Sequence, residues 1–173
     1  MIAAVRGGAD LDIRYTAFSL DQVHVPEGEP PVWEREPKEW GSGVLALLYG
    51  IAARDQFADS FEDAHLALFA ARHDHGLKLD EEAVLRKAVA SAGLDADVVA
   101  AEAWSGRPLK TLAAEHTEAV ERWAVFGVPT FIEGDDAAFI RFMERGRVGD
   151  LERALDMLGW TDLNEFKRPS VPR

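Results

Sequence analysis

The sequence predicts an α/β domain that carries a helical subdomain. Residues 44–125 follow a helical period almost throughout, whereas a strand pattern precedes them and a hairpin pattern follows them. Helices inserted between an early strand and a late hairpin form a subdomain beside a mixed core. We therefore expect a single domain over residues 1–173, with its core at about 9–43 and 126–160 and its helical insertion at about 44–125.

The first predicted element is a strand at residues 11–18. Apolar and polar residues alternate there, and β-branched and aromatic side chains are frequent. Residues 21–43 are expected to form a long surface loop, because neither a helix nor a central strand tolerates their density of proline. The prolines of this loop are Pro26, Pro30, Pro31 and Pro37.

Breaks in the helical period separate several helices within residues 44–125. Aspartate and serine are favoured at helix starts because their side chains accept hydrogen bonds from the first backbone N–H groups. Proline is tolerated in the first turn because its missing N–H would have no partner there. The predicted helix starts are Asp59 or Ser60, Asp80, Asp95 and Pro108, and the helix from Asp95 reaches Trp104.

After Gly127 the pattern changes from helix to strand. Residues 128–133 and 137–142 flank Gly-Asp-Asp at 134–136, which predicts an antiparallel hairpin. Gly149-Asp150 is predicted to cap a final helix that continues to Leu158, and residues 161–173 have little periodicity.

Composition restricts the classes of partner. The chain has 31 acidic and 19 basic side chains, a formal charge of −12, which argues against nucleic acid or an anionic membrane surface as a partner. No apolar run approaches the ~20 residues that span a bilayer, and the first residues lack the apolar core of a signal peptide. We expect a cytoplasmic protein.

The chain contains no cysteine, so its own residues form no disulfide, no thiolate zinc site and no catalytic thiol. His73 and His75, with His65 two turns earlier, raise the alternative of a metal site. Basic side chains are favourable near a helix C-terminus, which explains His73 and His75 without a metal ion. We therefore predict no metal site. No serine lies in a nucleophile elbow, so we assign no catalytic residue.

The run Phe126-Gly127-Val128-Pro129-Thr130 leads into an apolar strand and resembles the proline loop of thioredoxin-fold proteins. Together with the element order, it resembles the DsbA family, whose members carry a helical insertion in a thioredoxin-like core. Residues 13–20, 65–73 and 163–167 resemble further family segments, the last one a tail of actinobacterial members that include mycothiol-dependent reductases. The resemblance covers residues 10–166 and implies a thiol-disulfide oxidoreductase-like protein.

The start of the chain departs from the family pattern. The resemblance implies a first strand and a Cys-x-x-C motif before residue 10, whereas residues 2–8 look like the last turn of a helix and its glycine exit. We interpret the chain as an incomplete family domain that lacks the N-terminal βα unit. The alternatives are a short protein that pairs the two remaining strands directly, or one in which a second chain fills the gap.

The resemblance also implies a substrate-binding site at the proline loop, formed by Phe126, Val128, Pro129 and Thr130. A cis Pro129 would present the backbone amide and carbonyl of Val128 to an extended peptide or a small thiol. The residue pattern alone would favour a trans proline at a strand start, but the resemblance reverses this preference and implies a cis bond. Trp123 is the tryptophan expected to contact a ligand.

Asp150 has two interpretations, helix capping and binding of the amino group of a thiol cofactor. Three functional hypotheses follow. The chain is an incomplete oxidoreductase-like protein without redox cysteines, a glutathione-transferase-like or isomerase-like protein that uses bound mycothiol or glutathione, or a redox-silent binding module. The expected partner is a small thiol or a disulfide-containing peptide or protein, and homodimerisation is left open.

Overall fold

The computed structural model describes residues 12–140, 147–160 and 162, and these fall into two compact units. One unit comprises residues 14–122 and is helical. The other combines residues 12–13 with the described residues from Trp123 onward and contains a hairpin and one helix. The boundary between the two units falls just before Trp123, which is the last residue of helix α7 (Arg107–Trp123). The prediction of one domain over the whole chain stays a prediction.

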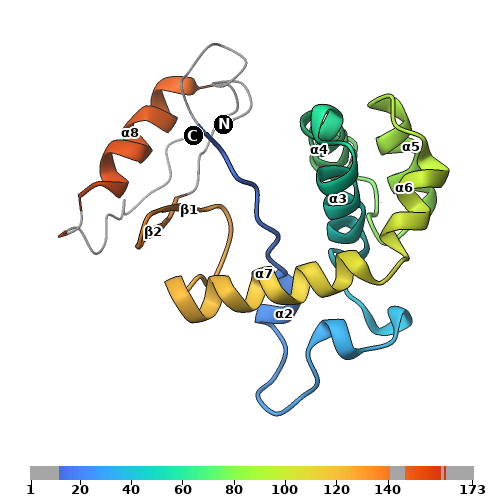
Figure 1. The fold of residues 1–173 in the computed structure, drawn as a ribbon, viewed down its shortest axis with the longest axis horizontal. Coiled ribbons are helices and arrows are strands. Elements are labelled where there is room, and N and C mark those ends of the chain that lie inside the picture. The colour runs from blue at the N-terminus through green and yellow to red at the C-terminus, as the bar shows by residue number, and fades with distance from the viewer. Residues whose placement is uncertain (1–11, 141–146, 161, 163–173) are drawn as a thin grey trace. The chain divides into compact units, whose positions relative to one another are not determined.

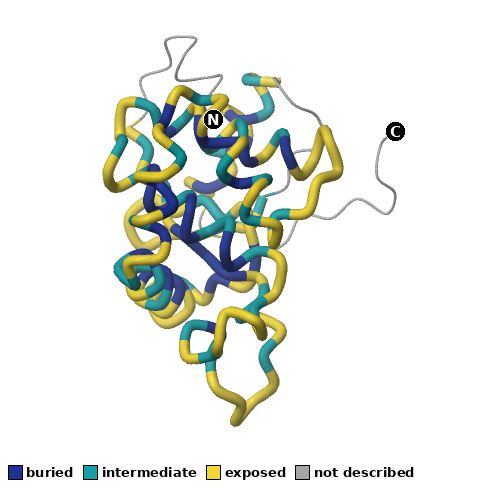
Figure 2. Tube along the Cα trace, turned by 90° about the vertical axis from the view of Figure 1, so that its right-hand side faces the viewer, coloured by how far each residue is buried: buried dark blue, intermediate teal, exposed yellow. Residues whose placement is uncertain are grey.

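The helical unit contains two short 3₁₀ turns among its helices (Figure 1). The loop between the first helix and the first 3₁₀ turn is exposed along most of its length (Figure 2), as expected for the proline-rich segment. The elements in chain order are α2 (Leu20–Val23), η1 (Val32–Glu34), η2 (Pro37–Glu39), α3 (Val44–Gln56), α4 (Ala58–His73), α5 (Glu82–Ser91), α6 (Ala96–Ala103) and α7 (Arg107–Trp123).

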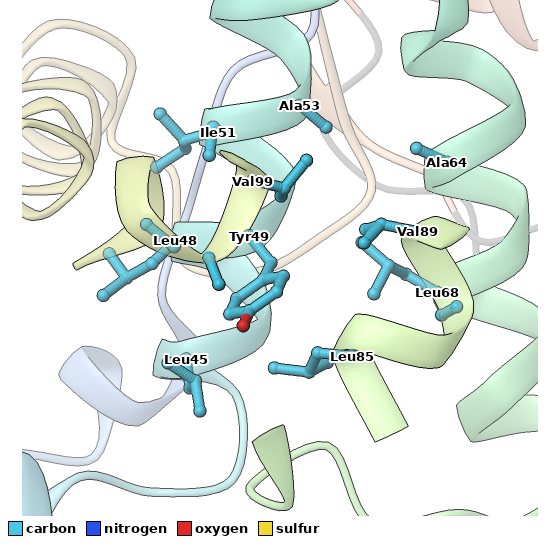
Figure 3. Packing of buried hydrophobic residues seen from close by; sticks show 14 of the residues in the cluster. Leu45, Leu48, Tyr49, Ile51, Ala53, Ala64, Leu68, Leu85, Val89 and Val99 are labelled. Atoms are coloured by element: carbon cyan, nitrogen blue, oxygen red, sulfur yellow. The ribbon is translucent and has the colours of Figure 1, made fainter. Parts of the chain in front are cut away.

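The core of this unit surrounds α3, which packs against α4, α5 and α6. Tyr49 is fully buried at its centre, and the aliphatic side chains that surround it come from all four helices (Figure 3). Its hydroxyl donates a hydrogen bond to Glu82 Oε1 at 2.7 Å. Burial and this carboxylate both raise the pKa of Tyr49. Leu48, Leu85, Val89 and Val99 are among the other side chains buried in this core.

The predicted strand at residues 11–18 is wrong for the part that the structure describes, since residues 12–18 belong to no sheet. Side chains of α7 instead bind the backbone donor of Ala17, within this segment, and that of Ser19, just after it. Ala17 N–H donates to Glu115 Oε2 at 2.6 Å, and Ser19 N–H donates to His116 Nδ1 at 3.2 Å. Side-chain acceptors thus replace the ladder partner that a strand would need.

Helix starts were predicted with mixed success. Asp95 caps α6 by accepting hydrogen bonds from the two backbone amides that follow, as predicted. Asp59, Ser60 and Asp80 do not cap, because α4 follows directly on Phe57 and the extended residue before α5 is Glu81. α7 begins at Arg107, one residue before Pro108.

The second unit confirms the predicted hairpin. β1 (Thr130–Glu133) pairs antiparallel with β2 (Asp136–Phe139), and Gly134 turns the chain with a positive φ of 61°. The connection is two residues long, one fewer than predicted. α8 (Val148–Leu158) packs against β2 and buries Leu151, Ala154 and Leu158.

Some expectations concern residues outside the described ranges. These are the helix-end interpretation of residues 2–8, the start of the first strand at 11, the end of the second hairpin strand at 141–142, and the tail at 161 and 163–167. Among the described helices, none has the length and apolar character needed to cross a membrane.

Candidate functional site

The proline loop joins the end of α7 to β1. Ala124 leaves the helix with a positive φ of 52°, and Val125 then buries its side chain. The next residue points outward, since the side chain of Phe126 is 67% exposed. The loop is therefore anchored by one apolar residue and displays another to solvent.

Two hydrogen bonds define the shape of this loop. Thr130 Oγ1 donates to the carbonyl of Gly127 at 2.7 Å, and the Ile140 backbone N–H donates to the carbonyl of Pro129 at 3.1 Å. The Val128–Pro129 peptide bond lies between them and is cis. The first hydrogen bond thus lies within the loop, and the second joins the loop to Ile140, just after β2.

Gly127 makes a close approach to Phe139 within the unit. A Cβ atom at this position would lie 3.3 Å from a ring carbon of Phe139, tighter than most contacts of that kind. The Phe139 ring also contacts Phe126, with 5.2 Å between ring centroids. Phe139 was not predicted from the sequence; its position opposite Thr130 in the hairpin register is the signal that would have identified it.

Val128 combines an exposed side chain with backbone groups that have no partner among the described residues. Its side chain is 43% exposed, and within the described ranges its backbone N–H and C=O have no hydrogen-bond partner. A backbone donor and acceptor on one exposed residue are the groups that an extended peptide pairs with. The exposed backbone groups of Val128 are therefore chemically suited to pairing with an extended peptide.

Trp123 lies beside the hairpin turn rather than at the loop's exposed surface. Its indole Nε1 donates to the carbonyl of Gly134 at 3.3 Å, and its side chain is half-buried. This contact connects the end of α7 with the turn between β1 and β2. Contact of Trp123 with a ligand stays a prediction.

Asp150 lies in the first turn of α8, where a carboxylate interacts favourably with the helix dipole. The predicted capping role is wrong, because α8 starts at Val148 and its N-cap residue is Arg147. The Asp150 carboxylate forms an ion pair with Arg147, whose Nε lies 3.1 Å away, and accepts a hydrogen bond from Arg153 Nη1 at 2.9 Å. It is thus already paired with two guanidinium groups.

The histidines of α4 belong to an aromatic row. His65 lies between the rings of Phe61 and Phe69, with centroid distances of 5.4 and 4.6 Å, and Phe69 in turn contacts His73. Burial lowers the pKa of His65. Over the described part of the chain, no three His, Asp or Glu side chains lie where they could hold a metal ion.

A comparison with known protein families identifies one that matches most of the chain. The family model described as DSBA-like thioredoxin domain matches residues 3–156. A search among curated proteins found no match. The matched range includes the proline loop, the hairpin, all the described helices before α8 and most of α8 itself.

Proposed function

We propose that this chain, which belongs to the DSBA-like thioredoxin domain family, binds disulfide-containing peptides at its proline loop as a thiol-disulfide oxidoreductase-like protein. The observation that supports the proposal is the exposed Val128, whose backbone donor and acceptor have no partner within the described residues. The exposed ring of Phe126 adds apolar contact area next to it. The alternative ligand is a small thiol. The proposed compartment is the cytoplasm.

The residues of this polypeptide position a substrate and do not attack it. Disulfide exchange requires a thiolate nucleophile, and the chain contains no cysteine. Any exchange on a peptide held here would use a thiol that another molecule supplies. We therefore expect the polypeptide alone to show no dithiol reductase activity, and turnover of a disulfide substrate by it would contradict the proposal.

The hypothesis of a bound thiol cofactor receives less support. It assigned Asp150 to the amino group of mycothiol or glutathione, whereas that carboxylate pairs with Arg147 and Arg153. A redox-silent binding module would use the same loop, so it differs from the main proposal in the ligand and not in the site.

Isothermal titration calorimetry tests the proposal with an oxidised, disulfide-containing peptide. Truncating an exposed aromatic contact at a binding site typically costs about 1–2 kcal/mol, so Phe126→Ala is expected to weaken binding about fivefold to thirtyfold. Phe69→Ala is the matched control, because Phe69 is a similarly exposed phenylalanine on α4 (51%). Equal affinities of the two variants, or no binding by the wild type, would refute the site.

A further inference from the structure

Helix α4 carries apolar side chains on the face that points away from the core of the helical unit. The opposite face contributes Ala64 and Leu68 to that core (Figure 3). On the outer face, the side chain of Leu66 is 43% exposed and that of Phe69 is 51% exposed. Neighbouring apolar side chains on the surface of a helix are typical of a surface that contacts another protein.

The spacing of the residues on this outer face is that of a coiled-coil seam. Side chains at successive intervals of three and four residues form one stripe along a helix, and this stripe can interlock with a similar stripe of a second helix. The two apolar residues occupy the middle of the stripe, and polar residues occupy its ends. The residues that follow one another at intervals of three, four, three and four are Asp59, Glu62, Leu66, Phe69 and His73.

The two ends of α4 differ in charge. Asp59 lies in the first turn and Glu62 follows shortly after it, whereas Arg72 and His73 lie in the last turn. Two copies of α4 in antiparallel orientation would place the acidic start of each helix beside the basic end of the other. The positive end of each helix dipole would also lie beside the negative end of the other. Antiparallel pairing with a second copy is therefore electrostatically complementary, and parallel pairing is not.

The ring of Phe69 is already held in place on the helix surface. It contacts the ring of His65 at a centroid distance of 4.6 Å and that of His73 at 5.5 Å. A side chain that is ordered before binding loses less conformational entropy when an interface forms. The stripe thus has a preformed aromatic side chain at its centre.

We propose that two copies of this chain form a two-fold symmetric dimer in which α4 pairs with α4 in antiparallel orientation. In this register Leu66 packs against Phe69 of the second copy, and Glu62 accepts a hydrogen bond from the imidazole of the second copy's His73. The symmetry repeats each contact twice, which requires a self-complementary surface such as this stripe.

The net charge of the chain limits the strength of this dimer. Each copy has a formal charge of −12, which opposes association at low ionic strength. In about 0.3 M salt, exposed charges more than about 6 Å apart are largely screened. A single pair of helices also buries less area than a standard protein interface, so we expect a dissociation constant of about 10–300 µM under these conditions.

Sedimentation velocity of the full chain at increasing protein concentration measures this equilibrium. The sedimentation coefficient should rise toward that of a dimer as the concentration approaches about 500 µM. Leu66→Gln and Phe69→Gln each alter two contacts of the symmetric interface, so each should raise the dissociation constant at least about tenfold. Val120→Gln is the matched control, because Val120 on α7 is also 43% exposed, and it should change the constant less than about twofold.

Disulfide cross-linking tests the antiparallel register, because the chain has no cysteine of its own. In the proposed dimer, position 62 of one copy lies beside position 73 of the other, whereas the two positions 62 are about 16 Å apart along the helix axes. A mixture of Glu62→Cys and His73→Cys, one of them tagged, should therefore form a disulfide between unlike chains under mild oxidation. Either variant alone should cross-link at least about fivefold more slowly, because its thiols are too far apart.

Three results would overturn the inference. The first is a wild type that stays monomeric at every concentration, as it would if residues outside the described ranges cover this stripe. The second is equal dissociation constants for Leu66→Gln and Val120→Gln. The third is faster cross-linking of Glu62→Cys alone than of the mixture, which would indicate parallel helices. No peptide is present in these experiments, so their outcome is independent of peptide binding at the proline loop.

Discussion

Arg54 and Glu115 form a two-contact ion pair that joins α3 to α7. Arg54 Nη1 lies 2.9 Å from Glu115 Oε2, and Nη2 lies 2.8 Å from Oε1. Burial alone would lower the pKa of Arg54, but the hydrogen bonds to Glu115 and Asp55 raise it. Because Glu115 Oε2 also accepts from Ala17 N–H, one carboxylate connects both helices to the segment that precedes α2.

Removing this carboxylate is expected to destabilise the helical unit. Glu115→Ala leaves the buried Ala17 amide without its acceptor and removes one carboxylate from Arg54, which keeps Asp55. The free energy of unfolding should therefore fall by about 2 kcal/mol. Glu118→Ala is the matched control at an exposed position of the same helix, where we expect a change within about 0.5 kcal/mol. Urea denaturation measures both, and equal losses in the two variants would contradict the role given to Glu115.

His116 should make the protein less stable in mild acid. Its Nδ1 accepts from Ser19 N–H, so the folded state holds the imidazole neutral, and burial lowers its pKa. The unfolded chain then binds the proton more readily, and the stability contributed by His116 is lost as pH falls below about 6.5. The facing rings are Phe18 and Trp33, and the neighbouring carboxylate of Glu115 is paired with Arg54.

His116→Asn separates this effect from other titrations, because asparagine keeps an acceptor and does not titrate. The loss of unfolding free energy between about pH 7 and pH 5 should be smaller in the variant than in the wild type. Thermal denaturation across this range measures the difference. An unchanged pH dependence would show that His116 does not contribute.

Tyr49 should resist ionisation at high pH. Burial raises the pKa of Tyr49, and the Glu82 carboxylate that accepts the hydrogen bond of its hydroxyl raises this pKa further. The chain has two tyrosines, so an ultraviolet absorbance titration of phenolate should resolve one late transition that disappears in Tyr49→Phe. Persistence of the late transition in that variant would assign it to the other tyrosine.

The hydroxyl of Thr130 is expected to stabilise the conformation of the proline loop. Thr130→Val removes the hydrogen bond to the Gly127 carbonyl, and such bonds contribute about 0.5–1.5 kcal/mol. Affinity for the disulfide peptide should fall about twofold to tenfold in calorimetry. Thr117→Val makes the same substitution at an exposed position of α7 and should leave affinity unchanged, whereas equal effects would indicate a nonspecific cause.

The parts of the fold that depend on local pattern could be predicted from sequence. Asp95 caps α6 and the hairpin forms around Gly134, because capping and turn chemistry involve neighbouring residues. The parts that depend on distant side chains could not. The strand prediction before α2 failed where Ala17 N–H binds Glu115 and the following Ser19 N–H binds His116, nearly a hundred residues later in the chain.

The candidate site follows the same division. The proline loop was identifiable from Gly-Val-Pro-Thr, since a short motif carries it. The ion pairs of Asp150 with Arg147 and Arg153 depend on where α8 begins, which Gly149-Asp150 suggested incorrectly. The contact between Trp123 and the Gly134 carbonyl depends on how the chain leaves α7, which periodicity does not specify.

Chemical-shift mapping of the isotope-labelled protein with the oxidised peptide tests the central claim most directly. We predict that saturable shift changes concentrate on the backbone amides of Val128 and Thr130, with smaller changes at Phe126. Shift changes confined to residues 14–122, or no changes at saturating peptide, would contradict a binding site at the proline loop.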